Sequence, residues 1–215
     1  DLGLGKGISP HEFEAFSDDI GDADDAYEHC FSVLHQGFTR DRITHKSPRY
    51  SFNDVPVVIK PYQKPYPPLW YGLRGEFGPI FAAKHGMHGV SLGPDERVKA
   101  LSDAFRREWT LQAKERREFG AAVEKPVVGV MRAMFIADTD VEAELVARRA
   151  HEVWFQNLAW LWKVRGAEVP ISISADFDQA RAAGALSPVV RTMRPAFVLL
   201  KAHAIRIAAA MPIRR

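Results

Sequence analysis

Strand-like and helix-like segments alternate along most of this chain, and this alternation restricts the possible folds more than any other feature. The strand-like segments are residues 2–5, 68–72, 89–93 and 126–138, and the helix-like segments that follow them are 21–37, 76–86, 94–119 and 139–166. Alternation of short apolar strands with longer helices is typical of βαβ units that share a parallel sheet. The sequence therefore predicts an α/β fold with about four parallel strands.

Local signals mark the ends of several predicted helices. Thr139 and Glu142 form a capping box at the start of the helix over 139–166, and Gly166 follows its last periodic residue. Gly37 and Gly86 are expected to end the helices over 21–37 and 76–86. These signals predict the helix boundaries independently of the apolar pattern.

Two segments depart from a simple alternation. Residues 49–68 alternate around Asn53-Asp54 and end in several prolines, which predicts a small hairpin followed by an extended connector. The helix over 139–166 carries tryptophan and phenylalanine on more than one face, around 154–162. This distribution favours a helix in the core or in a subunit contact, and a helix that lines a substrate cavity is the alternative.

Composition excludes several classes of protein. The chain has 215 residues, 47% hydrophobic and 26% charged, which is ordinary for a globular protein with one large or two small domains. A formal charge of +2 gives no reason to expect a nucleic-acid partner, and the apolar runs are shorter than the ~20 residues of a membrane span. A single cysteine and the lack of a secretory signal at the first residues predict a cytoplasmic location.

The last part of the sequence has a different character. Residues 184–215 contain no acidic side chain, carry internal prolines and show weak periodicity. We therefore divide the chain into residues 1–183, which carry the repeated α/β units, and an atypical basic tail over 184–215. A shifted reading frame or an incomplete gene would produce such a tail, which would then not be native to the fold.

Two glycine-containing loops are candidates for binding an anion. Lys6 lies between two glycines just after the strand at 2–5, and Arg74 follows the strand at 68–72 in a loop with Gly75 and Gly78. Glycines let backbone N–H groups approach an anion, and the next helix adds its positive N-terminal end. Because ligands gather at the carboxyl ends of parallel strands, both cations could face one phosphate. An ordinary strand–helix turn with a surface cation is the alternative for each loop.

Other catalytic or metal-binding patterns are weak. His85 and His88 have roughly metal-ligand spacing, but Gly86 interrupts the helix between them and no third ligand is close in sequence, so we expect no metal site. The sequence contains no nucleophile elbow, Walker loop or dinucleotide fingerprint. No catalytic acid or base can be assigned from these residues.

Three stretches resemble the bacterial luciferase-like, flavin-dependent monooxygenases. These stretches are "LGLGKGISPHEFEAFSDD", "KPYQKPYPPLWYGLRGEFGPIFAAKHGM" and "MRAMFIADTDVEAELVARRAHEVWFQNL". They occur in the family's order, and the resemblance as a whole covers roughly residues 2 to 183. The resemblance implies a partial TIM-type (β/α)8 barrel with a small hairpin insertion. The family's first three strands would precede Asp1, and its last strands would follow about Gly184.

The resemblance also implies a cofactor site. Lys6 would contact the flavin phosphate, Gly5 and Ile8 would lie against the flavin, and Arg74, Gly75 and Gly78 would hold the phosphate and ribityl chain. Glycines stand here where the family has hydroxyl-bearing residues, so backbone amides and Arg74 would have to replace those hydroxyl groups. The expected cofactor is reduced FMN in preference to a deazaflavin.

The function implied is a monooxygenase that uses reduced FMN and O2 to oxidise a small organic substrate. The expected partners are a separate NAD(P)H flavin reductase and, for a complete protein, a second identical subunit. Because about four strands leave a barrel open, this chain alone is expected to have little activity. A non-catalytic flavin-binding protein and an inert gene fragment are the alternatives.

Overall fold

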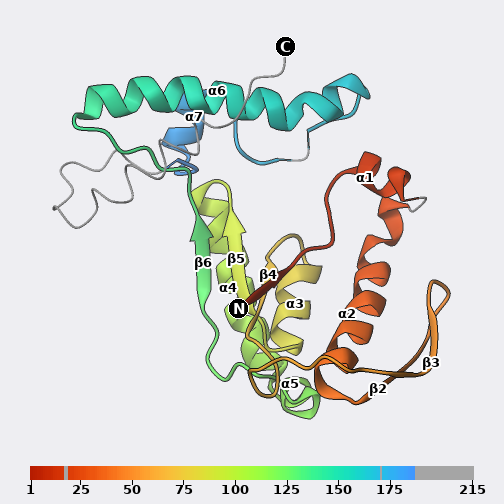
Figure 1. Cartoon of the computed structure of the whole chain (residues 1–215). Coiled ribbons are helices and arrows are strands. Elements are labelled where there is room, and N and C mark those ends of the chain that lie inside the picture. The colour runs from red at the N-terminus through yellow and green to blue at the C-terminus, as the bar shows by residue number, and fades with distance from the viewer. Residues whose placement is uncertain (17–18, 170, 187–215) are drawn as a thin grey trace.

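The computed structural model describes residues 1–16, 19–169 and 171–186 (Figure 1). In chain order the elements are β1 (Leu2–Leu4), α1 (Pro10–Ala15), the 3-10 helix η1 (Ile20–Asp22), α2 (Ala23–Thr39), β2 (Arg42–Lys46), β3 (Ser51–Pro56), β4 (Leu69–Gly72), α3 (Phe77–Lys84), β5 (His88–Leu92), α4 (Asp95–Leu111), α5 (Ala113–Phe119), β6 (Val128–Met131), α6 (Asp140–Val164) and α7 (Phe177–Ala182). The predicted basic tail lies outside the described residues from 187 onwards.

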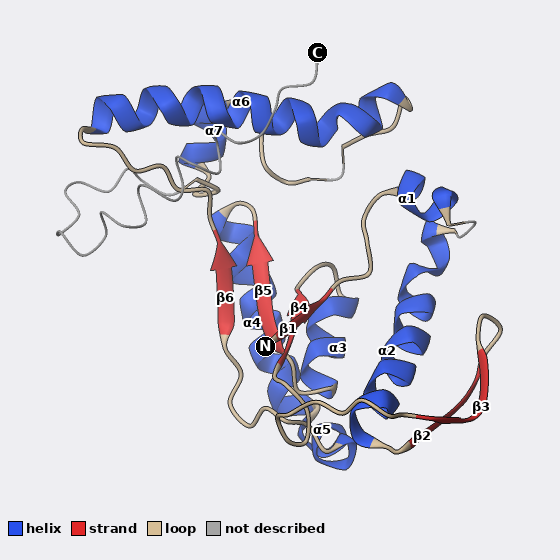
Figure 2. Ribbon diagram, in the orientation of Figure 1, coloured by secondary structure: helices blue, strands red, loops and turns tan. Residues whose placement is uncertain are grey.

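Four strands form one parallel sheet in the order β1-β4-β5-β6 (Figure 2). Leu4 of β1 pairs with Tyr71 of β4, and Leu92 of β5 pairs with Met131 of β6, so the carboxyl ends of all four strands lie at one edge. The predicted α/β fold class is confirmed, and the sheet corresponds to part of a barrel.

Helices α2 and α3 pack their apolar side chains against one face of the sheet, and α4 and α5 extend this layer (Figure 1). The main core joins aromatic residues of α2 and α3 to alternate residues of β4: Tyr27, Phe31, Leu69, Tyr71 and Phe81. The periodic stripe expected in α4 is also confirmed, because Val98 and Phe105 are buried and Leu101 and Trp109 pack against the core. The period-2 pattern of β4 and the helical period of α3 and α4 therefore meet in a single core.

The opposite face of the sheet is less covered by other parts of the chain. Trp70 and Val90 are half-buried, and a Cβ atom added to Gly129 on the neighbouring strand β6 would touch both. Leu92 and Met131 are exposed. Parallel sheets are usually covered on both faces. This face is the one that would form the interior of a closed barrel.

The hairpin insertion is present, but its turn was misplaced by the sequence prediction. Strands β2 and β3 pair antiparallel, and residues 47–50 form the turn, where the Ser47 amide donates to the Tyr50 carbonyl. Asn53 and Asp54 lie inside β3, next to a register shift between Ile43 and His45. Asp54 has a left-handed φ of 55°, so the turn-like signal at this position marks an irregular strand.

Three predicted boundaries also change. The helix expected over 94–119 divides at Gln112 into α4 and α5, and the strand expected over 126–138 is regular only at β6. Helix α2 continues through Gly37 and ends at Thr39, because isolated glycine is tolerated inside a packed helix. By contrast, the Thr139 hydroxyl accepts a hydrogen bond from the Glu142 amide, which confirms the predicted cap of α6.

Helix α6 crosses the molecule near the carboxyl edge of the sheet (Figure 1). Two ion-pair groups attach it: Arg148 binds Asp178 of α7, and Arg165 at the end of α6 binds Glu14 of α1. After α7, Leu186 forms a parallel bridge with Ala133, just beyond β6. Among the described residues, no helix has the length and apolar character required to cross a membrane.

Candidate functional site

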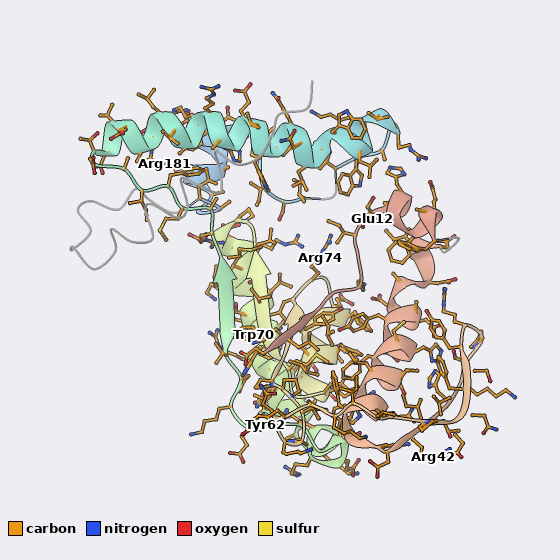
Figure 3. All side chains as sticks on the ribbon, viewed as in Figure 1. Glu12, Arg42, Tyr62, Trp70, Arg74 and Arg181 are labelled. Atoms are coloured by element: carbon orange, nitrogen blue, oxygen red, sulfur yellow. The ribbon has the colours of Figure 1, made fainter. Side chains whose placement is uncertain are left out.

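The parallel pairing of β1 with β4 brings the two predicted cationic loops to the same edge of the sheet. Lys6 lies two residues after the end of β1, and Arg74 lies two residues after the end of β4. The loop with Arg74 leads directly into α3, whose N-terminal end adds a partial positive charge at this edge. In Figure 3, Arg74 lies at the end of the sheet nearest α6, while Trp70 lies further from that helix.

The Lys6 ammonium group has two neighbours in the structure. It forms an ion pair with the Asp24 carboxylate in the first turn of α2, and it lies 5.2 Å from the centre of the Phe77 ring at the start of α3. The Lys6 side chain is about one quarter exposed. The structure therefore places Lys6 beside the N-terminal ends of both α2 and α3, with part of its charge already neutralised by Asp24.

Tyr71 connects the Asp24 side of this site to Arg74. The pKa of the Tyr71 hydroxyl is raised to about 12, mainly by burial in the core and also by the Asp24 carboxylate, while the Arg74 guanidinium acts in the opposite direction. These opposite effects on one hydroxyl group show that Asp24 and Arg74 are both within electrostatic reach of Tyr71. Tyr71 therefore stays protonated at neutral pH.

The glycines of the two loops differ in their surroundings. A Cβ atom added to Gly5, Gly72 or Gly75 would meet no atom within 4 Å, and Gly75 has a left-handed φ of 53°. At Gly78 an added Cβ atom would lie 3.3 Å from the Tyr71 ring. The backbone N–H of Gly78 donates to the Arg74 carbonyl at 3.2 Å. Gly5 and Gly75 thus have open space beside their Cα atoms, whereas Gly78 lets α3 pack closely on β4.

Ile8 is half-buried in the same loop as Lys6, and the next residue, Ser9, is fully buried. A hollow of about 270 Å³ lies between the end of β1, α2 and the hairpin, and both Gly5 and Lys6 are part of its lining. Its wall includes Leu4, Tyr27 and Tyr50. Since β1 pairs only with β4 among the described strands, this hollow lies in part along the free edge of the sheet.

Sequence reasoning missed two charged residues at the carboxyl edge. Asp24 was not named as a candidate site residue, yet it is the ion-pair partner of Lys6. Arg132, directly after β6, donates to the Gly93 carbonyl at 2.8 Å and pairs with Asp95 at 2.5 Å. Because the predicted strand ran from 126 to 138, Arg132 lay inside it, and only the early end of β6 in the structure places Arg132 at the carboxyl edge.

The two histidines with metal-ligand spacing have separate environments. The His85 ring is hydrogen-bonded to the Phe81 carbonyl, and the His88 ring accepts from the Val127 amide at 3.0 Å. No group of three or more potential metal ligands occurs in the part of the chain that the structure describes. Lys6 and Arg74 are the two cations that the sequence predicted at this edge, and whether they bind an anion stays a prediction.

A parallel sheet with its helices on one face and cationic loops at its carboxyl edge is typical of a TIM-barrel protein that binds a phosphorylated ligand. The sequence profile of the family described as luciferase-like monooxygenase matches residues 1–199. The chain belongs to this family, as its sequence motifs predicted.

Solved structures of similar fold include two monooxygenases. The monooxygenase RslO1 from Streptomyces bottropensis has a TM-score of 0.65 at 18% identity, and the match covers 96% of this chain and 57% of that one. The oxygenating constituent of 3,6-diketocamphane monooxygenase from the CAM plasmid of Pseudomonas putida, a type II Baeyer–Villiger monooxygenase solved in complex with FMN, has a TM-score of 0.54 at 17% identity over 86% and 52% of the two chains.

An F420-dependent secondary alcohol dehydrogenase, solved with an F420-acetone adduct, has a TM-score of 0.56 at 12% identity over 96% of this chain and 60% of that one. At these identities the three structures establish the fold alone. The chain spans between about half and three fifths of the length of each.

Proposed function

We propose that this chain is part of a monooxygenase that uses reduced FMN and O2 to oxidise a small organic substrate. The observation that carries the proposal is the placement of Lys6 and Arg74 at one edge of a parallel sheet in a luciferase-like monooxygenase. Bound reduced FMN would supply the electrons that activate O2. The residues of this chain would hold the cofactor phosphate and limit the access of water.

The edge of the sheet is suited to a phosphate group. Gly75 leaves its backbone open, the N-terminal end of α3 points to the same edge, and Arg74 offers a guanidinium group that can bind two oxygens of one phosphate. In this arrangement Gly5 and Ile8 would contact the flavin, and Gly78 would keep the α3 N-terminus close to β4. No catalytic acid or base is assigned among the residues that the structure describes.

The ion pair with Asp24 affects how Lys6 can bind a phosphate. The ammonium group of Lys6 can donate three hydrogen bonds, so it can bind Asp24 and a phosphate oxygen together. We expect Asp24 to orient Lys6 and to reduce its net attraction for the anion.

Fluorescence titration with FMN and with riboflavin tests the phosphate site directly, because riboflavin lacks the phosphate. Arg74→Met and Lys6→Glu should each weaken FMN binding by about tenfold or more, since a charge-assisted contact contributes roughly 1.5–3 kcal/mol. Both variants should leave riboflavin binding unchanged. Arg42→Met, on the distant hairpin (Figure 3), is the matched control because it removes an exposed, ion-paired cation.

Equal FMN affinity in the wild type and in both site variants would overturn the phosphate assignment. The same titration with a deazaflavin tests the cofactor choice, since the similar structures include an FMN complex and an F420 complex. Tighter binding of FMN is the expected result. Tighter binding of the deazaflavin would indicate that the protein uses a deazaflavin instead of FMN.

Two further measurements separate the alternatives. Flavin binding without O2 consumption, in the presence of an NAD(P)H flavin reductase, would favour a non-catalytic flavin-binding protein. Absence of a cooperative thermal transition by far-UV circular dichroism would favour an inert gene fragment. The cytoplasmic location and the partnership with a separate reductase belong to this same proposal.

A further inference from the structure

The hollow beside β1 is built from segments that are far apart in the chain. Leu4 at the end of β1, Phe13 of α1 and Tyr50 of the hairpin all contribute to its wall. Helix α2 contributes one face, formed by residues spaced four apart: Ala26, Cys30 and Leu34. The hollow therefore depends on the tertiary fold and is not an irregularity within one loop.

The hollow lies on the side of the sheet that carries the helices. Leu4 packs against the core that α2 and α3 share with β4. Side chains alternate between the two faces of a strand, so Leu4 points away from the uncovered face of the sheet. Arg74 and Gly75 are not part of the wall. A molecule in the hollow would thus lie between β1 and α2, separate from the phosphate position proposed at Arg74.

The wall of the hollow is mainly apolar and aromatic. Its aromatic rings come from α1, α2 and the hairpin: Phe13, Tyr27, Phe31 and Tyr50. Aromatic rings pack well against other rings, in stacked or edge-to-face arrangements. The wall therefore favours a flat aromatic molecule over a flexible polar one.

The polar groups of the wall already have partners. The Cys30 thiol donates to the Tyr50 hydroxyl at 3.5 Å, and the Lys6 ammonium group is paired with the Asp24 carboxylate. Because Asp24 neutralises the charge of Lys6, the hollow offers no uncompensated charge to a ligand. An uncharged molecule is therefore favoured over an anion.

The size of the hollow limits the number of rings. An apolar cavity of about 150 Å³ is large enough to bind benzene. At about 270 Å³ this hollow has nearly twice that volume, which corresponds to two fused rings. Strand β1 is also at the end of the described sheet, and a free strand edge carries backbone N–H and C=O groups that can bond to a ligand.

We propose that this hollow is a second binding site, which takes a neutral bicyclic aromatic molecule with one hydroxyl or N–H group, of the naphthol or indole class. The rings would pack on the α2 face at Ala26 and Leu34, where the small alanine leaves room for them. The hydroxyl or N–H group would bond to the free edge of β1. Such a site combines an apolar wall with one orienting polar contact, as small-molecule sites usually do.

Cys30 provides a direct test, because it is exposed, lies in the wall and is the single cysteine of the 215 residues. Alkylation by iodoacetamide is followed by mass spectrometry, without flavin and with increasing 2-naphthol. We expect a Kd on the order of 0.1 mM for a ligand of this size in a site that is open to solvent. At about ten times the Kd, alkylation should slow by about tenfold, because the bound rings cover the thiol. An unchanged rate at about 1 mM 2-naphthol would overturn the proposal.

Calorimetric titration of two variants of α2 tests the location. Ala26→Phe puts a ring into the hollow and should weaken 2-naphthol binding by about tenfold or more. Glu28→Phe is the matched control, because it adds the same side chain at an exposed position of α2 outside the wall. Equal losses in both variants would place the ligand elsewhere and overturn the site. The alkylation experiment uses the wild type, so it decides the proposal without any variant.

Two competing ligands test the chemical class and the separation from the cofactor. Naphthalene-2-sulfonate has the same rings with an anionic group, and it should bind no more tightly than 2-naphthol, because Asp24 neutralises Lys6. Binding of the sulfonate that is tighter by about tenfold would overturn the neutral class. Saturating 2-naphthol should leave the affinity for FMN within about twofold. Competition between them would put the flavin itself in the hollow and overturn a second site, whereas loss of the proposed flavin function alone would leave the Cys30 protection intact.

Discussion

His85 makes the stability of this protein sensitive to acid. Its ring lies in an aromatic cluster, with the ring centres of Phe31, Phe81 and Phe119 at 4.9, 4.2 and 4.8 Å. Burial lowers the pKa of His85 from the ordinary 6.5 to about 4, and the nearby positive charge of Lys84 acts in the same direction. The hydrogen bond to the Phe81 carbonyl acts in the opposite direction and is the smaller effect.

The size of the effect follows from proton linkage. A group with a lowered pKa in the folded state binds its proton more readily in the unfolded chain, so stability falls as pH decreases. The contribution of His85 is complete above pH 6.5 and decreases as the pH falls toward 4. A difference of about 2.5 pKa units corresponds to about 3 kcal/mol of unfolding free energy. His35, whose pKa burial also lowers, adds to this loss with the same sign.

Urea unfolding followed by tryptophan fluorescence, at several pH values from 7 to about 4, measures the effect. His85→Phe should cost about 1 kcal/mol at pH 7, because the hydrogen bond to Phe81 is lost. At the acid end it should be more stable than the wild type, since it removes the group that binds a proton on unfolding. Phe105→Leu, buried in the core beside Trp109, should lower stability equally at every pH.

Parallel pH profiles for the wild type and His85→Phe would refute this reasoning. They would mean that His85 is charged or solvated in the folded protein. The Phe105→Leu control excludes the possibility that any loss of core packing flattens the profile.

The structure makes two further predictions about stability. Gly86→Ala should lower the free energy of unfolding by about 2 kcal/mol or more in a thermal or urea melt. The new Cβ atom would lie 2.2 Å from the Ala121 side chain, and Gly86 has a left-handed φ of 61°. An unchanged melting temperature would contradict this geometry. Thr139→Ala should lower the free energy of unfolding by about 1 kcal/mol, because it removes the hydroxyl that accepts from the Glu142 amide. Thr139→Ser keeps a hydroxyl and should retain most of the stability. Equal losses in both variants would exclude the capping role.

Much of the fold could be predicted because its signals are local. The capping box at Thr139, the left-handed Gly86 and Gly166, and the periodic apolar residues of α4 each act over a few neighbouring residues. The alternation of strands and helices then predicted a parallel sheet, and parallel pairing put the loops of Lys6 and Arg74 at one edge. This part of the site followed from topology alone.

Local signals were misleading where tertiary contacts decided the outcome. Asn53-Asp54 has the composition of a turn, but the pairing of β3 with β2 holds both residues inside an irregular strand. Gly37 resembles a helix end, yet α2 continues to Thr39 before the hairpin begins. In both places the free energy of packing exceeds the weak preference of one or two residues.

Side-chain partners distant in the sequence could be found only in the structure. Asp24 reaches Lys6 because α2 begins beside the end of β1, and Arg132 reaches Asp95 because β5 and β6 are neighbours. The path of α6 near the carboxyl edge is also set by distant contacts, such as Arg165 with Glu14. The sequence by itself determined the elements and their order, since these depend on local periodicity. The charge balance of the site and the outward face of α6 depend on which elements meet, and only the tertiary structure decided that.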